Sequence, residues 1–144
     1  IRGSFHAIKT TTDATNMQYA VIEGVSFGIL DGVNSILKVN DNFDKVFMVG
    51  GGSRSSFWIE LIASLLERNL SVCDQSEYGA ALGVARLAMH VDKNIQDQNN
   101  IIKEIKISKE YTPQFDSIDL LKKRYKIWKD LYSANKMIAS NLIS

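Results

Sequence analysis

The chain is poor in the residue types that build disulfide-rich or metal-bound domains. Its 144 residues include one cysteine, Cys73, one proline and two histidines. A single cysteine excludes an internal disulfide and any cluster of cysteine ligands, and it fits a reducing compartment. His6 and His90 lie far apart, with no partner at the spacing of metal ligands, so we expect no metal site.

The chain also lacks a large net charge, because its positive and negative residues nearly balance. The net charge is +1, so no strong field attracts the chain to nucleic acid or to a membrane surface. No apolar run approaches the roughly 20 residues of a membrane helix, and the first residues lack a signal-peptide core. We therefore expect a cytoplasmic protein that binds neither nucleic acid nor membrane. Because the chain has no initiator Met, we also expect a fragment.

Hydrophobic periodicity predicts helices that alternate with short strands. Helices are expected at 14–38, 53–67, 78–90 and 116–141, and strands at 45–49 and 70–73. Polar residues predict loops at 40–44 and 91–100, and residues 101–107 form an alternating or irregular segment. The alternation favours an α/β fold with helices packed on a mostly parallel sheet. Two clear strands are too few for a stable sheet, so we expect part of a larger fold.

Glycines four residues apart occur on two of the expected helices. Gly24, Gly28 and Gly32 share one face of the first helix, and Gly79 and Gly83 share one face of the third. Small residues at this spacing let another backbone come close. We predict that each helix buries this face against the sheet or against the other helix. Direct contact with a ligand is the alternative.

The stretch "VGGGSRSSFW", residues 49–58, is the strongest local signal. A short strand runs into Gly50, Gly51 and Gly52, and a helix is expected to begin directly after them. The start of a helix offers unpaired backbone N–H groups and a partial positive charge, which together attract phosphate. The alternative is a tight turn that requires a positive φ, with the following serines as helix caps. Local spacing alone does not decide between the two.

Three kinds of nucleotide site compete for this loop. A P-loop requires a lysine after its last glycine, and none is present. A dinucleotide fingerprint would use Gly50 and Gly52, with Asp74 as the acidic residue after the next strand. Ser55 stands where that fingerprint requires its third glycine, which weakens this alternative. The third kind is the adenosine loop of sugar kinases.

Five segments of the chain resemble the C-terminal domain of the FGGY family of carbohydrate kinases. They are "IRGSFHAI", "AVIEGVSFGILDGV", "VGGGSRSSFW", "YGAALGVARLA", and Tyr111-Thr112-Pro113 followed by "RYKIWKDLY". All five occur in the family's order and at similar spacing, and together they cover nearly the whole chain. Within the family, the segments are most similar to those of the xylulokinases.

The resemblance implies a ribonuclease H-like, actin-like ATPase fold, with residues 1–144 in its C-terminal ATP-binding lobe. It implies that Gly51, Gly52 and Ser53 lie under the adenosine and the α-phosphate, and that Ser56 lies beside the adenine. The family's catalytic Asp, sugar contacts and phosphate hairpins lie upstream. The resemblance therefore implies no catalytic residue and no Mg²⁺ ligand in this chain.

The reaction that the resemblance implies is phosphoryl transfer from MgATP to a ketose, such as D-xylulose to xylulose 5-phosphate, leaving ADP. A homodimer is compatible with it. The sequence leaves two alternatives open. One is a nucleotide-binding module without turnover, and the other is a different FGGY kinase, such as a ribulokinase, gluconokinase or glycerol kinase.

Other conspicuous residues have simpler expected roles. Arg54 is expected to face solvent rather than a phosphate, and Glu23 to make a capping or helix-face hydrogen bond. Trp128 is expected in the core or in a subunit interface. The basic cluster on the last helix is expected to be a solvated face; it consists of Lys122, Lys123, Arg124 and Lys126.

Overall fold

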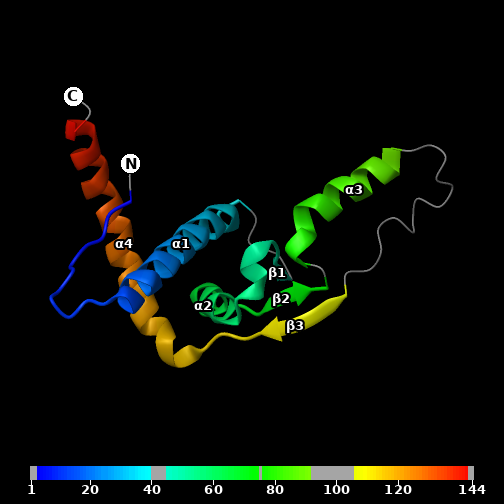
Figure 1. Ribbon diagram of the computed structural model, residues 1–144, viewed down its shortest axis with the longest axis horizontal. Coiled ribbons are helices and arrows are strands. Elements are labelled where there is room, and N and C mark those ends of the chain that lie inside the picture. The colour runs from blue at the N-terminus through cyan, green and yellow to red at the C-terminus, as the bar shows by residue number, and fades with distance from the viewer. Residues whose placement is uncertain (1–2, 40–44, 75, 92–105, 143–144) are drawn as a thin grey trace.

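The computed structural model describes residues 3–39, 45–74, 76–91 and 106–142 (Figure 1). In chain order, the α-helices and strands are α1 (Ala14–Leu37), β1 (Val46–Met48), α2 (Ser56–Leu66), β2 (Leu70–Cys73), α3 (Gly79–Val91), β3 (Ile107–Tyr111) and α4 (Phe115–Leu142). Two short 3-10 turns, η1 (Gly51–Arg54) and η2 (Ser76–Tyr78), precede α2 and α3. The four predicted helices and two predicted strands are confirmed. The loop expected at 40–44 lies outside the described residues, as do residues 92–100 of the loop expected at 91–100 and residues 101–105 of the segment 101–107. Of the remaining positions, Val91 ends α3 and Ile107 begins β3.

The sheet has the order β1-β2-β3 and is mixed rather than mostly parallel. β1 and β2 are parallel, with Val46 opposite Leu70, whereas β3 is antiparallel to β2, with Tyr111 opposite Leu70. The sequence did not predict β3 because four of its five residues are exposed, so it carries no run of buried apolar positions. The α/β class is confirmed, with an antiparallel edge strand added to its parallel pair.

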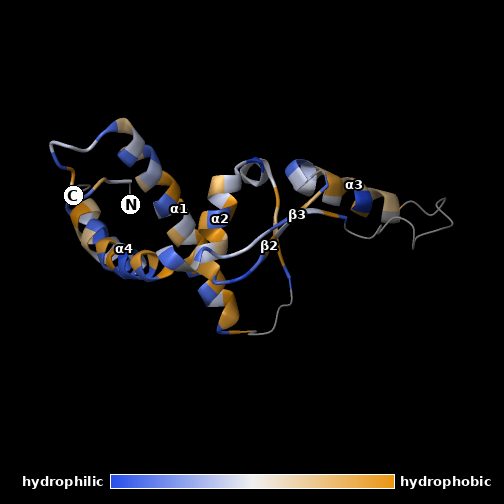
Figure 2. Cartoon of the chain, turned by 90° about the horizontal axis from the view of Figure 1, so that it is seen from below, coloured by the Kyte–Doolittle hydropathy of each residue, from blue (hydrophilic) through white to orange (hydrophobic). Residues whose placement is uncertain are grey.

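Helix α2 lies at the centre of the packing, between the sheet and the two long helices (Figure 1). Toward the sheet it contributes to a core cluster of Ile59, Ile62, Ala63, Leu70, Val72 and Tyr111. Toward α1 and α4 it contributes to a second cluster of Phe27, Leu61, Leu65 and Leu121. Apolar residues therefore occupy more than one side of α2, which is why its colour in Figure 2 is largely hydrophobic.

Helix α1 begins directly after its N-cap residue, Asp13. The Asp13 side chain accepts from the backbone N–H of Asn16 at 2.7 Å, and the Asn16 side chain accepts from the N–H of Asp13. This reciprocal capping box satisfies two of the helix's free donors. The hydroxyl of the preceding residue, Thr12, accepts from the backbone N–H of Lys9.

By length and mean hydropathy, 1.4 in an 18-residue window, α1 does satisfy the requirement for crossing a membrane. The expectation that no apolar run approaches the length needed to span a bilayer is corrected to this extent. Length and composition do not distinguish such a segment from the core helix of a soluble protein. Here α1 packs its Ser26 and Phe27 face against α2 and α4.

The predicted packing of the glycine faces is wrong at most positions. A Cβ placed on Gly28, Gly32 or Gly83 would meet no described atom within 4 Å. A Cβ on Gly24 would lie 3.9 Å from the indole nitrogen of Trp128, and a Cβ on Gly79 would lie 3.1 Å from Val49 Cβ. Helix α1 makes its contacts through another face, and α3 extends away from the remaining helices (Figure 1).

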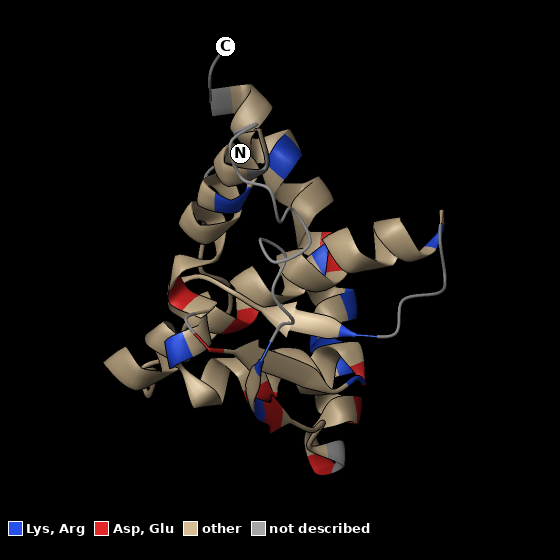
Figure 3. Ribbon diagram, turned by 90° about the vertical axis from the view of Figure 1, so that its right-hand side faces the viewer, with Lys and Arg blue, Asp and Glu red and all other residues tan. Residues whose placement is uncertain are grey.

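The basic cluster on α4 makes two ion pairs with neighbouring elements. Lys122 pairs with Glu67 at 2.6 Å, and Arg124 donates to Glu23 at 2.8 Å. Charges of both signs occur over the molecule as a whole (Figure 3). The cluster is exposed, as predicted, but it also ties α4 to α2 and α1.

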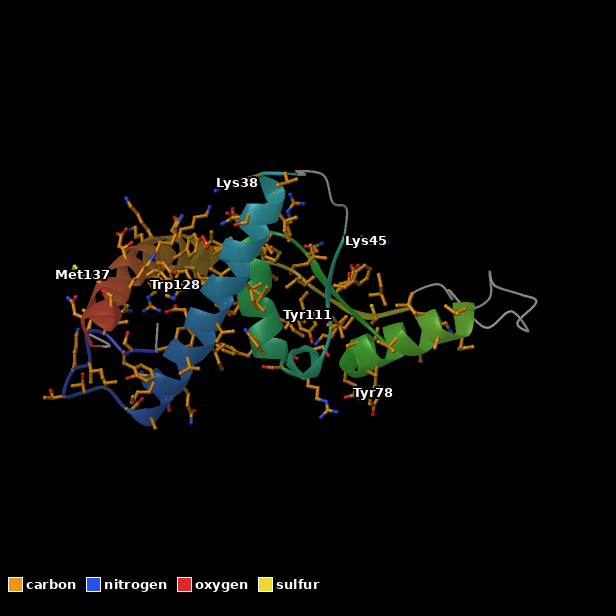
Figure 4. All side chains as sticks on the ribbon, turned by 90° about the horizontal axis from the view of Figure 1, so that it is seen from above. Lys38, Lys45, Tyr78, Tyr111, Trp128 and Met137 are labelled. Carbon is orange, nitrogen blue, oxygen red and sulfur yellow. The ribbon has the colours of Figure 1, made fainter. Side chains whose placement is uncertain are left out.

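Trp128 packs against the core, which is one of the two locations predicted for it; the other was a subunit interface. Its ring lies 6.1 Å from that of Phe27 and stacks on Tyr125 at 6.1 Å, so it closes the seam between α1 and α4 (Figure 4). Aromatic pairs at such distances stabilise a seam beyond the area they bury.

Candidate functional site

The turn between β1 and α2 is built on Gly50. This residue has φ 85° and ψ −171°, a region of backbone space that is essentially restricted to glycine. Its N–H donates to the carbonyl of Ser76 at 2.7 Å, which joins the first turn to the second. The expectation of a positive φ is confirmed at this one glycine of the three.

The helix does not begin at residue 53, as the sequence had suggested. Residues Gly51–Arg54 form the 3-10 turn η1, Ser55 is extended with φ −98°, and α2 begins at Ser56. The Ser55 hydroxyl accepts from the backbone N–H of Trp58 at 3.3 Å, so Ser55 is the N-cap of α2. The cap interpretation is therefore confirmed for this serine.

The hydroxyl of Ser53 is held within the turn. It donates to the carbonyl of Gly50 at 2.8 Å and accepts from the hydroxyl of the buried Ser76 at 2.8 Å. The same Ser76 also accepts the Gly50 N–H through its carbonyl. Ser53 and Ser76 thus fix η1 on η2, and the shape of the turn does not depend on a ligand.

The two glycines of η1 have different surroundings. A Cβ on Gly52 would lie 2.8 Å from Met48 Cε and 2.8 Å from the Trp58 ring, so this position is glycine because the core approaches it. A Cβ on Gly51 would meet nothing within 4 Å. Gly51 is exposed, so its backbone is accessible on the open side of η1, ahead of α2.

Ser56 has a partner that the sequence did not reveal. Its hydroxyl lies 3.0 Å from the hydroxyl of Tyr111, which comes from β3, 55 residues further along the chain. This hydrogen bond, with the Lys109 ammonium 4.5 Å above the ring, lowers the pKa of Tyr111. Tyr111 was noticed in the sequence only as part of a motif, because no local pattern links it to Ser56.

Arg54 is exposed, as predicted, but it is not isolated. Its Nε donates to Glu77 Oε2 at 2.6 Å, and a second nitrogen of the guanidinium also contacts that oxygen. The Arg54 guanidinium holds the pKa of Glu77 below its usual value. This ion pair is a second connection between η1 and η2, on the solvent side of the turn.

The described residues contain no group of three or more His, Cys, Asp or Glu side chains that could hold a metal ion. Nearest the turn, the carboxylate of Glu77 is engaged by Arg54. Asp74, the acidic residue of the dinucleotide alternative, is exposed after β2, and its backbone N–H donates to the backbone carbonyl of Lys106. Because Ser55 caps α2 instead of packing a glycine against the strand, the turn lacks the geometry of that fingerprint.

A wide, open groove lies elsewhere, between the N-terminal arm, α1 and α4. Its volume is about 830 Å³, and its walls include Phe5, Phe27 and Trp128 together with the Glu23–Arg124 ion pair. None of its lining residues belongs to the segment 50–56. Glu23, for which a capping or helix-face hydrogen bond was predicted, forms an ion pair with Arg124 that joins α1 to α4.

Comparison with known proteins agrees with this architecture. Residues 1–91 match the FGGY family of carbohydrate kinases, C-terminal domain. A xylulose kinase from Staphylococcus epidermidis is 24% identical over 145 residues, which cover 100% of this chain and 29% of that protein.

Among solved structures, a xyloylose kinase from Brucella ovis superposes with a TM-score of 0.80 and 28% identity, over 96% of this chain and 28% of that one. Plasmodium falciparum glycerol kinase with ADP has a TM-score of 0.62 over 91% of this chain and 26% of its own, and at 16% identity it shows likeness of fold alone.

The helices, the small mixed sheet and the glycine turn are those of a C-terminal lobe of the actin-like ATPase fold. The chain belongs to the FGGY family of carbohydrate kinases. It spans less than a third of the length of the relatives it matches.

Proposed function

We propose that this chain supplies the adenosine-binding side of an ATP-dependent sugar kinase. The observation that carries the proposal is the turn of residues 50–56, whose backbone is open at Gly51 and leads into the first turn of α2. Backbone N–H groups at such a helix start are suited to a phosphate or to the polar edge of a nucleotide. In this proposal Gly51, Gly52 and Ser53 lie under the adenosine and α-phosphate, and Ser56 lies beside the adenine.

The structure modifies what each of these residues can contribute. Gly52 offers only backbone groups, because a side chain at this position would meet Trp58. Ser53 offers its backbone carbonyl, because its N–H and its hydroxyl both donate to the carbonyl of Gly50. Gly51 offers an accessible backbone, and Ser56 an exposed side chain. The chemistry that ATP supplies is its transferable γ-phosphoryl group, and the role of these residues is to hold the other end of the molecule.

For the substrate, we propose a ketose, with xylulose favoured because curated relatives over the chain's full length are named xylulose kinase. Other FGGY sugar substrates, and a module that binds nucleotide without turnover, are the alternatives. Mg²⁺ would accompany ATP, but the described residues near the turn do not fit a Mg²⁺ site, since Glu77 is paired with Arg54. A cytoplasmic location and a homodimer stay predictions.

A titration of the isotope-labelled chain with ATP, followed by NMR, tests the nucleotide site. Chemical-shift changes should centre on residues 50–56, with affinity in the millimolar range. Gly51→Val should abolish them because a branched side chain fills the open face, while Gly83→Val, at an equally open position on α3, should leave them unchanged. Equal binding by both variants would remove the turn from the site. NADH binding in place of ATP would instead support the dinucleotide alternative.

The substrate is tested separately, because it concerns the longer enzyme. A panel of ketoses, gluconate and glycerol with a full-length protein containing this chain should show preferred phosphorylation of xylulose. Nucleotide binding without phosphorylation of any sugar would favour the non-catalytic module.

A further inference from the structure

The three serines that follow the glycines are used in different ways. The Ser53 hydroxyl is engaged by the Gly50 carbonyl and by Ser76, and the Ser55 hydroxyl caps α2. Ser56 is the exposed one whose hydroxyl contacts a distant element, at the phenol of Tyr111. If a serine of this turn presents its hydroxyl to a ligand, its geometry is therefore set by Tyr111.

Tyr111 is well suited to hold a hydroxyl in one place. Tyr111 is only 7% exposed and belongs to the same core cluster as Ile59 and Ala63 of α2. The ring lies beside α2 (Figure 4), and its phenol reaches the first residue of that helix. A buried aromatic ring has little rotamer freedom, so the phenol oxygen is a fixed point rather than a mobile surface group.

Either hydroxyl of the pair can be the donor. When Tyr111 donates, the Ser56 proton is available to a ring nitrogen of a purine. When Ser56 donates, its oxygen is available to accept from the exocyclic amine of adenine. In both arrangements Tyr111 holds one hydrogen-bonding position of Ser56 Oγ and leaves another for the base.

We propose that Tyr111 is a positioning residue for the adenine base and acts through the hydroxyl of Ser56. The inference rests on the proposed nucleotide site and adds a base-specific element to it, one that comes from β3 rather than from the glycine turn.

The test compares a nucleotide with a ligand that has no base. Tyr111→Phe keeps the ring in the core and removes only the phenol, and Tyr132→Phe, on an exposed tyrosine of α4, is the matched control. Tyr111→Phe should weaken ATP binding to the chain by about three- to tenfold, the effect of one neutral hydrogen bond. Binding of inorganic tripolyphosphate should be unchanged in both variants, and melting temperatures should confirm that both fold.

A double-mutant cycle shows whether the effect passes through Ser56. Ser56→Ala should weaken ATP binding to the same degree, the double variant should bind no more weakly than Ser56→Ala alone, and Ser56→Thr, which keeps the hydroxyl, should retain affinity. Two results would overturn the inference while leaving the nucleotide site standing: unchanged ATP affinity in Tyr111→Phe, or an equal loss in the Ser56→Ala background. Failure of the unmodified chain to bind ATP would overturn the proposed function first, and this inference with it.

Discussion

The indole N–H of Trp58 donates a hydrogen bond of 2.8 Å to the hydroxyl of Ser26, joining α2 to α1 across 32 residues of sequence. Ser26 is only 1% exposed, and its hydroxyl in turn donates to the carbonyl of Ile22 at 2.7 Å. The same Trp58 ring closes the space beside Gly52. One buried serine therefore fixes the side chain on which the glycine turn packs.

Ser26→Ala should destabilise the fold by about 1–3 kcal/mol, because it leaves the part-buried indole N–H without an acceptor. Ser35→Ala is the matched control: Ser35 also donates to the carbonyl four residues back, at 2.9 Å, but it is exposed. That substitution should change the free energy of unfolding by less than about 0.5 kcal/mol. Urea denaturation of both variants measures the difference, and equal stabilities would show that water replaces the serine.

Single alanine substitutions should separate the roles of the three glycines in the turn. Gly50→Ala forces a side chain into a conformation suited to glycine, and Gly52→Ala drives a Cβ against Trp58 and Met48, so each should cost about 1–3 kcal/mol. Gly51→Ala meets nothing and should be tolerated within about 0.5 kcal/mol. Thermal melting without nucleotide measures all three. A Gly51 variant as unstable as the others would contradict the open face assigned to it.

The elements predicted best from the sequence are those whose local pattern agrees with their packing. Helix α2 and the strands on either side carry dense apolar runs, and their positions were found within a few residues. The start of α2 was placed too early because the 3-10 turn and the extended Ser55 have no hydrophobic signature. β3 was missed because its solvent-facing residues leave Tyr111 as its one buried position.

The site was predictable only in part, for a similar reason. The glycines and the cap at Ser55 act through neighbouring residues, so spacing could indicate them. The contacts of Ser56 with Tyr111, Arg54 with Glu77 and Ser53 with Ser76 join distant segments, and no local periodicity encodes them. For the glycines of α1 and α3 the error was the reverse. Their regular spacing predicted contacts, and at most of these positions the described residues make none.

Gly28→Ala should stabilise the chain, in contrast to the substitutions in the turn. The residue lies inside α1, and a Cβ there would meet nothing within 4 Å. Alanine is preferred over glycine in a helix interior by about 1 kcal/mol, so the melting temperature should rise. Gly83→Ala tests the same point on α3, and a loss of stability in either variant would show that the predicted small-residue packing exists after all.

Removing the Arg124 guanidinium should weaken the contact between α1 and α4. The partner carboxylate of Glu23 has a side chain only 12% exposed, whereas Arg124 is 44% exposed. Because the pair is partly screened by solvent, Arg124→Gln should cost about 1 kcal/mol rather than the larger amount of a buried pair. Lys123→Gln, the neighbouring exposed position, should stay within about 0.5 kcal/mol. Denaturation at low and high salt checks both, and only the Arg124 difference should shrink at high salt.

The Arg54–Glu77 pair should make the turn sensitive to acid. Glu77 has its pKa lowered in the folded chain by the hydrogen bond from Arg54, so its contribution to stability is present above the ordinary carboxyl pKa of about 4.3. That contribution should disappear as the pH falls through the lowered value, where the carboxylate becomes protonated in both folded and unfolded states. In Arg54→Met the NMR titration midpoint of Glu77 should move up toward the ordinary value. The stability difference between this variant and the parent should be measurable at neutral pH and vanish in acid. A Glu77 midpoint that is the same in both proteins would mean that the ion pair does not persist in solution, and that Ser53 and Ser76 alone hold η1 against η2.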